Sequence, residues 1–579
     1  MAGLAAIAAA VAAAALLLRS VYLWLMPKPI PGLPHNKDSA GRISGDVPYF
    51  AEYDKAARFR TRFFYDLVAK HKSAVVQVLL PFSKPLVIVA DYRESRDLMA
   101  KRSKELSRGY MKNVAWQGFL SEHFIAMEDA HPSFKTSRFL TKDLMTNSFL
   151  HSVSAPASHV AISDFIRLWK RKAALAQGLP FETVEDLEGL TYDIMMTAVF
   201  GVGYEESTTT KYSKLLEDAN EDSINPGGSS AQVAKFPSPE TPALVKALHV
   251  LNVSITAVFG SVFPKLSVFI ENLKPKARQA LKLKKDAVQT QIDAAVKRAA
   301  KGVSSEHKSA VDYVVSREKT AAIEEGREPK YNGMRLNDML WGYIAGGQDS
   351  THSTLCFTVK YLGAHQEAQQ KLRSALRSTY TEPYAQKREP TIEEILRTQV
   401  PYLDAFIEET LRLCSPAGAI TKETVRDINV LGHIIPKGTT IMFLLTGPTF
   451  VQPGVPVDDA KRSETSQKAS SEGVGDWSHS DFPAEDFAPE RWLQQAEGEG
   501  EAVKFNNNAG PFMSFSSGPR GCWGKRLAYL ELRMIVTLLV WNLEFLKLPA
   551  ELEDSGLTEG LFTKPKSSMI KLRVISDAE

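Results

Sequence analysis

A single cysteine in a glycine-rich segment is the residue of this sequence best placed to carry out chemistry. Cys522 lies in the stretch FMSFSSGPRGCWGKR, which begins at Phe512. Cys522 is expected just before a helix N-terminus, where free N–H groups and partial positive charge favour a thiolate. The surrounding glycines allow the backbone to approach a flat, bulky group. The helix is indicated by apolar residues at helical spacing, namely Leu527, Leu530, Met534, Leu538 and Trp541.

The cysteine content limits what such a thiolate binds. Cys356, Cys414 and Cys522 are far apart in the sequence and show no C-x-x-C spacing. This pattern argues against a disulfide framework and against a four-cysteine zinc site. A lone thiolate suits one axial position on a metal whose other positions are already filled, as in haem iron. The alternative is a small buried side chain in a helix-capping turn.

The residues around Cys522 resemble the haem-binding signature of the cytochrome P-450 family. The resemblance implies that Cys522 ligates the iron of haem b (iron protoporphyrin IX). It also implies that Arg520 pairs with a haem propionate, that Phe515 shields the sulfur, and that Gly518 belongs to the same cofactor-binding set. The pattern F-x-x-G-x-R-x-C-x-G-x-x-x-A is matched by Phe515, Gly518, Arg520, Cys522, Gly524 and Ala528.

Two further segments carry charged residues that the family also has. Glu409 and Arg412 in AFIEETLRLCSP are three residues apart and share one helix face. The alternative for such a pair is an ordinary surface ion pair. In FAPERWL, Arg491 belongs to a P-E-R sequence like that of the family. The resemblance implies that Glu409, Arg412 and Arg491 form a network behind the haem that serves folding and haem retention.

The segment MLWGYIAGGQDSTHSTLCF predicts an apolar helix that contains the adjacent glycines Gly346 and Gly347. Each costs about 1 kcal/mol relative to alanine, which close approach to a flat cofactor would offset. The segment resembles the [AG]-G-x-[DE]-T-[ST] motif of the family, with Ser350 in place of the usual threonine. This implies that Asp349 and Ser350 deliver protons to O2, with Thr351 as a substitute hydroxyl. The alternative is a helix-packing notch with a solvated aspartate.

Weaker resemblances add two cofactor-binding candidates. FKTSR is similar to the W-x-x-x-R sequence of the family, with phenylalanine for tryptophan, and implies that Arg138 contacts a propionate. TKETVRDINVLGHIIPKGT is similar to a strand region of the family, where Lys422 replaces the usual arginine. Lysine is a point charge without the planar fork of arginine.

The N-terminal residues are apolar, with one interruption at Arg19. About 20 apolar residues span a bilayer, and positive charges that follow the stretch favour a cytosolic main domain. Residues 1–26 are therefore predicted to be an uncleaved membrane anchor; the alternative is a cleaved signal peptide. The prolines of residues 27–48 predict a stiff hinge.

Residues 49–579 are predicted to form one haem domain, mainly α with a small β region, in the cytochrome P-450 fold. Two β-branched runs within residues 74–91 predict a hairpin, and residues 451–481 predict a flexible surface insertion. A formal net charge of +3 gives no indication of a nucleic-acid partner.

The resemblance implies a microsomal monooxygenase of the endoplasmic reticulum membrane, single-pass with a cytosolic catalytic domain. Its expected partners are an NADPH-dependent flavoprotein reductase, which supplies electrons, a lipophilic small-molecule substrate and membrane lipid. O2 is the expected co-substrate. The alternatives are a haem-thiolate isomerase or dehydratase that needs no external electrons, and a haem-binding membrane protein without catalytic activity.

Overall fold

The computed structural model describes residues 2–55, 61–201, 207–225, 232–301, 309–475, 481–495 and 503–575. These residues are mainly helical with small sheets, as predicted. The longer helices are α1 (Ala2–Leu25), α2 (Val47–Lys55), α3 (Thr61–His71), α4 (Tyr92–Ala100), α5 (Tyr110–Gln117), α6 (Pro132–Leu140), α8 (Ala155–Ala176), α9 (Val184–Phe200), α10 (Thr208–Leu215), α12 (Ala243–Phe259), α13 (Pro264–Leu273), α14 (Pro275–Ala300), α15 (Ala310–Glu324), α16 (Met334–Ala364), α17 (Gln366–Thr379), α20 (Pro401–Leu413), α21 (Glu464–Ser471) and α22 (Lys525–Asn542).

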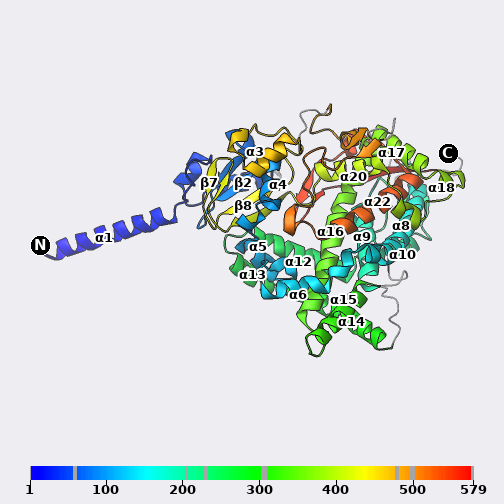
Figure 1. Ribbon diagram of the computed structural model, residues 1–579, viewed down its shortest axis with the longest axis horizontal. Helices are drawn as coiled ribbons and strands as arrows, with labels where there is room; N and C mark the ends of the chain where they lie inside the picture. Colours follow the sequence, from blue (N-terminus) through cyan, green and yellow to red (C-terminus); the bar gives the residue numbers. More distant parts are fainter. Residues whose placement is uncertain are drawn as a thin grey trace.

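The largest sheet lies at one side of the molecule, next to α3 and α4 (Figure 1). The predicted hairpin is confirmed: Val76 pairs with Ile88 in an antiparallel ladder. The strand order is β1-β2-β8-β5-β3, with β2 parallel to β8 and the other pairs antiparallel. These strands are β1 (Val75–Val78), β2 (Leu86–Val89), β3 (Leu106–Ser107), β5 (Ala419–Thr424) and β8 (Thr440–Leu444).

Smaller sheets lie elsewhere in the chain. The strand predicted near the C-terminus is β14, which pairs with β11 on one side and β4 on the other. Short antiparallel pairs are formed by β6 with β7, β9 with β10, and β12 with β13. The bounds are β4 (Phe181–Glu182), β6 (Ile428–Val430), β7 (His433–Ile435), β9 (Leu493–Gln495), β10 (Val503–Phe505), β11 (Leu543–Leu546), β12 (Leu557–Glu559), β13 (Thr563–Pro565) and β14 (Met569–Val574).

Helix α16 runs through the middle of the helical part, with α9 beside it (Figure 1). The two helices approach closely at Gly347, where an added Cβ would lie 2.5 Å from the sulfur of Met195. α20 and α22 also pack on α16, and they contribute Phe406 and Leu538 to a buried core. Since the segment that carries Cys522 leads directly into α22, this packing fixes the cysteine relative to α16.

The proline-rich segment of residues 27–48 is docked on the sheet. Gln77 accepts a hydrogen bond from the backbone N–H of Ile30 and donates to the carbonyl oxygens of Ile30 and Leu33. Asp46 accepts from the backbone N–H of Leu79 at 2.7 Å. The segment predicted as a hinge is therefore held to the domain by a buried glutamine and a buried aspartate.

Residues 451–475 of the predicted insertion contact α4. Arg462 forms a two-pronged ion pair with Asp91, the N-cap of α4, at 2.7 and 2.8 Å. Ser463 donates to Asp97 in the same helix, and α21 follows directly. The described part of the insertion thus packs on the domain; its predicted flexibility stays a prediction, and residues 476–480 lie outside the described residues.

Helix α1 extends away from the rest of the molecule (Figure 1). Leu17, Leu18 and Trp24 are among its exposed apolar side chains. Within the part of the chain that the structure describes, none of the helices combines the length and the apolar character needed to cross a membrane.

Candidate active site

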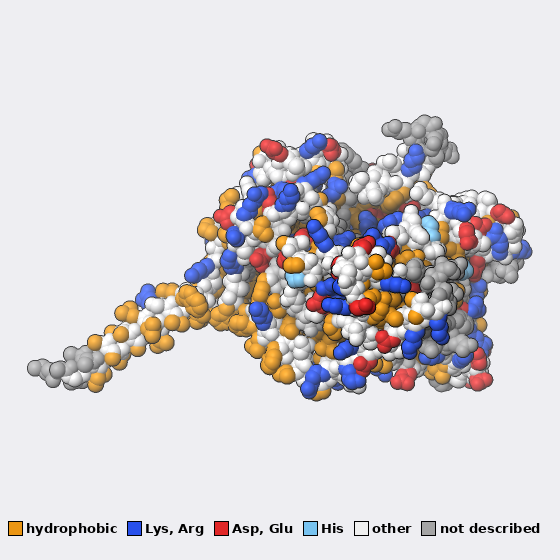
Figure 2. Space-filling model, turned by 60° about the horizontal axis from the view of Figure 1, so that its bottom comes forward, with side chains coloured by type: hydrophobic (Ala, Val, Ile, Leu, Met, Phe, Trp, Pro, Cys, Tyr) orange, Lys and Arg blue, Asp and Glu red, His pale blue; other side chains and the backbone are white. Residues whose placement is uncertain are grey.

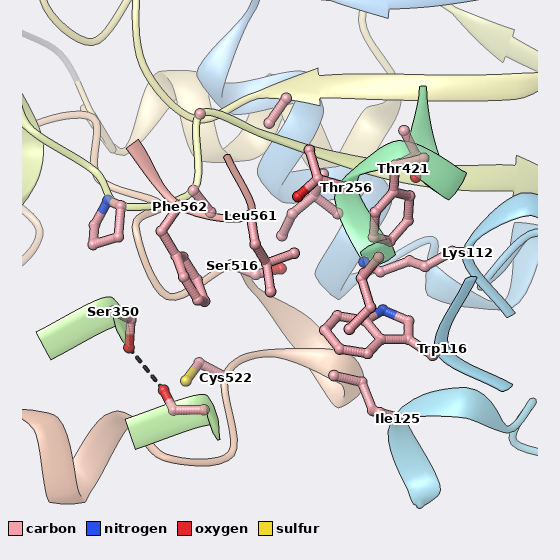
Figure 3. A pocket seen from close by; sticks show the side chains of 18 of the residues that line it. Lys112, Trp116, Ile125, Thr256, Ser350, Thr421, Ser516, Cys522, Leu561 and Phe562 are labelled. Carbon is pink, nitrogen blue, oxygen red and sulfur yellow. Dashed lines mark hydrogen bonds between the residues drawn. The ribbon is translucent and has the colours of Figure 1, made fainter. Parts of the chain in front are cut away.

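A large cavity of about 1410 Å³ lies between α16, the Cys522 segment and the edge of the main sheet. Its walls are largely apolar and come from α5, α12 and the turn after β12, with Trp116, Ile255 and Phe562 as examples. Figure 3 shows Cys522 and Ser350 on the same side of this cavity, approaching it from the Cys522 segment and from α16.

The Cys522 segment is held by its backbone. The N–H of Cys522 donates to the carbonyl oxygen of Phe515 at 2.8 Å. Gly518 has φ +73°, and an added Cβ would lie 1.9 Å from the carbonyl oxygen of Met99 at the end of α4. Only glycine fits that position. The Phe515 ring packs on Tyr529 with ring centroids 5.1 Å apart. These contacts leave the Cys522 thiol exposed to the cavity.

The predicted thiolate is not favoured by the protein alone. Although the thiol opens to the cavity, the surrounding protein partly removes it from water, which raises the pKa of Cys522 against the opposing hydrogen bonds from the backbone N–H groups of Gly524 and Lys525. The thiolate expected at this helix N-terminus stays a prediction. A cation at the sulfur supplies the missing stabilisation, since a metal-coordinated thiol is deprotonated.

Arg520 and Arg138 both line the cavity, as predicted. Arg520 donates to the carbonyl oxygen of Met127 at 2.7 Å and lies 2.5 Å from Asp129. Its guanidinium also stacks over the ring of Phe134, 4.2 Å from the centroid, and Arg138 lies over Phe124 in a similar way. The phenylalanine of the FKTSR sequence thus supports Arg520.

Lys422 does not itself line the cavity among the described residues, but it lies in the same cationic group. Burial, together with Arg108 and Arg520, lowers the pKa of Lys422 to about 8. Arg108 was missed by the sequence analysis; burial and Arg520 lower its pKa to about 10. It lines the cavity and belongs to no motif that we considered, so nothing in the sequence distinguished it from a surface arginine.

The two glycines of α16 have different roles. An added Cβ at Gly346 would meet open space, so this residue leaves the helix flat towards the cavity. Gly347 instead allows the close packing on α9 described above. Ser350 lines the cavity, and its Oγ donates to the carbonyl oxygen of Gly346 at 2.8 Å (Figure 3).

Asp349 does not line the cavity among the described residues. It is buried between α12 and β13, where it accepts a hydrogen bond from Asn252 at 3.0 Å and pairs with Lys564. Adjacent residues of a helix point about 100° apart, so Ser350 faces the cavity while Asp349 faces these partners. The structure therefore places the predicted acid, Asp349, behind the cavity wall and in contact with α12 and β13.

A second acid, which the sequence analysis missed, lies at the cavity wall. Thr351 donates to Glu531 of α22 at 3.4 Å, and Glu531 lines the cavity. One of its oxygens, Oε1, has no hydrogen-bond partner among the described residues. Burial raises the pKa of Glu531 to about 8, so this carboxyl holds a proton at neutral pH. Its position nine residues after Cys522, on the cavity face of α22, is the signal that could have found it.

The predicted charged network is present and buried. The Glu409 carboxylate accepts from Arg412 at 2.7 and 2.8 Å and from Arg491 at 2.9 Å. It also accepts from the backbone N–H of Ala488 and from the indole of Trp492. Arg412 further donates to the carbonyl oxygen of Phe450. The network joins α20 to the segment before β9 and contributes no side chain to the cavity, which agrees with a structural role.

These residues fit haem. The Cys522 thiol lines the cavity, and so does Gly346, which leaves a surface of α16 free of a side chain. Arg108, Arg138 and Arg520 lie along one wall, and two of these have their pKa lowered by burial among like charges. Buried cations of this kind need anions, which the two propionates of haem provide.

Comparison with known proteins gives the same result. The model of the cytochrome P450 family matches residues 57–448 and 482–572. The chain is 33% identical over 576 residues to cytochrome P450 monooxygenase TRI13 of Fusarium sporotrichioides, which covers 96% of this chain and 97% of that protein. It is 31% identical to cytochrome P450 monooxygenase GME11363 of Pestalotiopsis microspora, with coverage of 98% and 97%.

A third relative, cytochrome P450 monooxygenase xilC of Penicillium crustosum, is 28% identical over 97% of this chain and 95% of its own length. The gap in the family match, residues 449–481, contains the insertion that packs on α4. With a cysteine thiol, a cationic wall and a matched family model across the domain, the chain belongs to the cytochrome P450 family and is a haem-thiolate monooxygenase.

Proposed function

We propose that this monooxygenase inserts one oxygen atom from O2 into a lipophilic small molecule, using electrons that a separate NADPH-dependent flavoprotein reductase supplies. The observation that carries the proposal is the large apolar-walled cavity in which Cys522 and Ser350 face the same space. When bound, haem supplies the iron that activates O2 for this transfer.

The residues of the chain then have separate tasks. Cys522 would hold the haem iron, and the arginines of the cationic wall would bind its carboxylates. Ser350 presents a hydroxyl at the cavity wall, where it donates or accepts a proton. The protonated carboxyl of Glu531, bonded to Thr351, supports proton delivery from within the cavity wall. Asp349 acts only indirectly, because it is bonded to Lys564 and Asn252 and does not line the cavity.

We also propose that the enzyme sits on the endoplasmic reticulum membrane, with α1 as the anchor and the catalytic domain in the cytosol. An apolar surface outside α1 supports this. Phe82, after β1, stacks on Phe263, before α13, with centroids 6.1 Å apart. Leu266, Phe269 and Ile270 of α13 are exposed beside them. Figure 2 shows hydrophobic side chains along α1 and on the face of the domain next to it.

The same surface adjoins the cavity. Ser83, Val262 and Pro264, which flank Phe82 and Phe263, are among the lining residues. A lipophilic substrate dissolved in the bilayer would therefore meet an opening at the membrane-facing surface. This arrangement favours a substrate that partitions into lipid.

Vesicle flotation tests the membrane proposal. We expect the full chain to float with vesicles, and the chain without residues 1–26 to float less but still measurably. Adding Phe269→Glu to the shortened chain should abolish the remainder, whereas Ile323→Glu, at an exposed apolar residue of α15, should not. Equal flotation of all variants, or none by the full chain, would contradict the proposal.

The electron source is tested separately from the membrane. Product formation from a lipophilic compound should require NADPH and added reductase together. Conversion of a substrate by the haem-loaded enzyme alone, at an unchanged rate without NADPH, would instead favour the isomerase or dehydratase alternative.

A further inference from the structure

Lys112 of α5 lines the cavity, and the proposed function gives this lysine no role. It lines the cavity with Trp116 and Thr256, and Figure 3 shows its side chain extending from α5 into the cavity, on the other side of the view from Cys522. No hydrogen bond or ion pair joins its ammonium group to any residue that the structure describes. Lys112 is half-buried, and in such a wall its charged form needs an anionic partner, which a ligand in the cavity can supply.

The charges around Lys112 make the need for an anion stronger. The charged groups that act on it are all cations, namely Arg108, Lys422 and Arg520, and together with burial they hold the pKa of Lys112 well below its usual value. The nearby acids are engaged elsewhere: Asp129 lies against Arg520, and Glu128 accepts from Asn113 and from the backbone N–H of Arg108.

The haem propionates do not account for Lys112 in the same way as for the other cations. Arg138 and Arg520 stack on Phe124 and Phe134, in the wall that leads to the Cys522 segment. Lys112 instead shares its part of the cavity with Trp116 and Thr256 of the apolar wall (Figure 3). It therefore lies where the cationic wall meets the apolar wall, within reach of a substrate in the cavity.

We propose that Lys112 binds a carboxylate at the end of the lipophilic substrate that lies remote from Cys522. This proposal rests on the proposed function and narrows the substrate to an apolar molecule that carries one acidic group. A single ammonium binds a carboxylate as a point charge, while the apolar wall receives the rest of the molecule. With its carboxylate bound by Lys112 and the rest of the molecule on the apolar wall, the substrate would present one particular carbon to the Cys522 side of the cavity.

The test uses probes that bind haem iron directly, so that it needs no knowledge of the substrate. Imidazolyl alkanoic acids of increasing chain length are compared with their methyl esters by the spectral shift of the haem-loaded enzyme. At the best chain length we expect the acid to bind at least about tenfold more tightly than its ester, a difference of about 1.4 kcal/mol. Lys112→Met should remove this preference, and Lys112→Arg should keep it.

The control is Lys265→Met, which removes an exposed cation that lies over the ring of Tyr110 in the same α5. It should leave the preference for the acid unchanged. No preference in the wild-type enzyme, or a preference that survives Lys112→Met, would overturn the proposal. Loss of haem from Lys112→Met would overturn it too, because that result assigns the lysine to the propionates.

Failure of this proposal is distinguishable from failure of the proposed function. Imidazole probes report a substrate-binding cavity above the haem whether or not they carry a charge. Equal binding of acid and ester with NADPH-dependent oxidation of a neutral lipophilic compound would reject the carboxylate and keep the monooxygenase.

Discussion

Ser350 Oγ donates a hydrogen bond of 2.8 Å to the carbonyl oxygen of Gly346, one helical turn earlier in α16. Both residues line the cavity, so the bond holds the hydroxyl at the wall where the Cys522 thiol also reaches the open space. A serine with this bond needs no methyl group to fix its rotamer. The hydrogen bond supplies the constraint that threonine would otherwise supply by its branching.

In Ser350→Ala, we therefore expect NADPH to be consumed with less of it leading to product. A positioned proton donor contributes about 100-fold or more to such steps, so we expect product per NADPH consumed to fall by about tenfold or more. Ser350→Thr, the matched control, should stay near the wild-type ratio. The measurement is product and NADPH in the same reaction; an unchanged ratio in Ser350→Ala would remove the serine from the mechanism.

Gly518→Ala should displace the Cys522 segment. The glycine has φ +73°, and the new methyl group would lie 1.9 Å from the carbonyl oxygen of Met99. Left-handed backbone alone costs a non-glycine residue about 1–2 kcal/mol, and the clash adds to this. We expect loss of most bound haem, measured as the ratio of haem to protein absorbance. Gly41→Ala, where the methyl group meets open space, should retain haem.

Glu409→Gln should unfold the protein more easily than any surface change. It leaves Arg412 and Arg491 buried without their carboxylate, which typically costs about 3–5 kcal/mol. The free energy of unfolding from denaturant titration measures the effect. Glu490→Gln is the control, because this partly exposed carboxylate with Lys371 and Tyr402 should be worth about 1 kcal/mol or less. Equal losses in the two variants would show that burial of the network contributes little.

The stability of the protein should depend on pH through Glu531. Burial raises the pKa of Glu531 to about 8 from the ordinary value of about 4.5, so the folded state keeps a proton that the unfolded state loses. The contribution is fully present below about pH 4.5 and is lost as the pH rises to about 8. Glu531→Gln has no carboxyl that titrates at this position, so the variant does not lose this stability as the pH rises.

The melting temperature of Glu531→Gln relative to wild type should therefore rise between about pH 5 and about pH 8. Thermal unfolding at both pH values measures it. A difference that stays constant, or that moves in favour of the wild type as the pH rises, contradicts a protonated Glu531 in the folded state.

Local sequence could predict the parts of the site that are themselves local. The turn around Cys522 depends on neighbouring glycines, and the Glu409–Arg412 pair on spacing within one helix, so both were found. Arg108, Lys112 and Glu531 were not identified as site residues, because each becomes special only where separate elements converge. Asp349 illustrates the converse: its helix was predicted, but the side chain pairs with Lys564, from a distant strand, and does not line the cavity.

The same distinction holds for the fold. Two β-branched runs predicted the β1–β2 hairpin, and the helical spacing after Cys522 predicted α22. The parallel pairing of β2 with β8 could not be predicted, because Val87 and Ile441 lie far apart in the sequence. The docking of residues 451–475 was hidden for a similar reason: Arg462 finds its partner, Asp91, in an element near the other end of the domain.

The binding of haem iron by Cys522 is the central claim, and one spectrum tests it most directly. The purified, haem-loaded protein is reduced and exposed to carbon monoxide. We predict the strongly red-shifted absorption of thiolate-bound haem in the wild type and its absence in Cys522→Ala, with Cys356→Ala and Cys414→Ala unchanged. Folded, haem-containing wild-type protein without this absorption, or Cys522→Ala protein that retains it, would contradict the account.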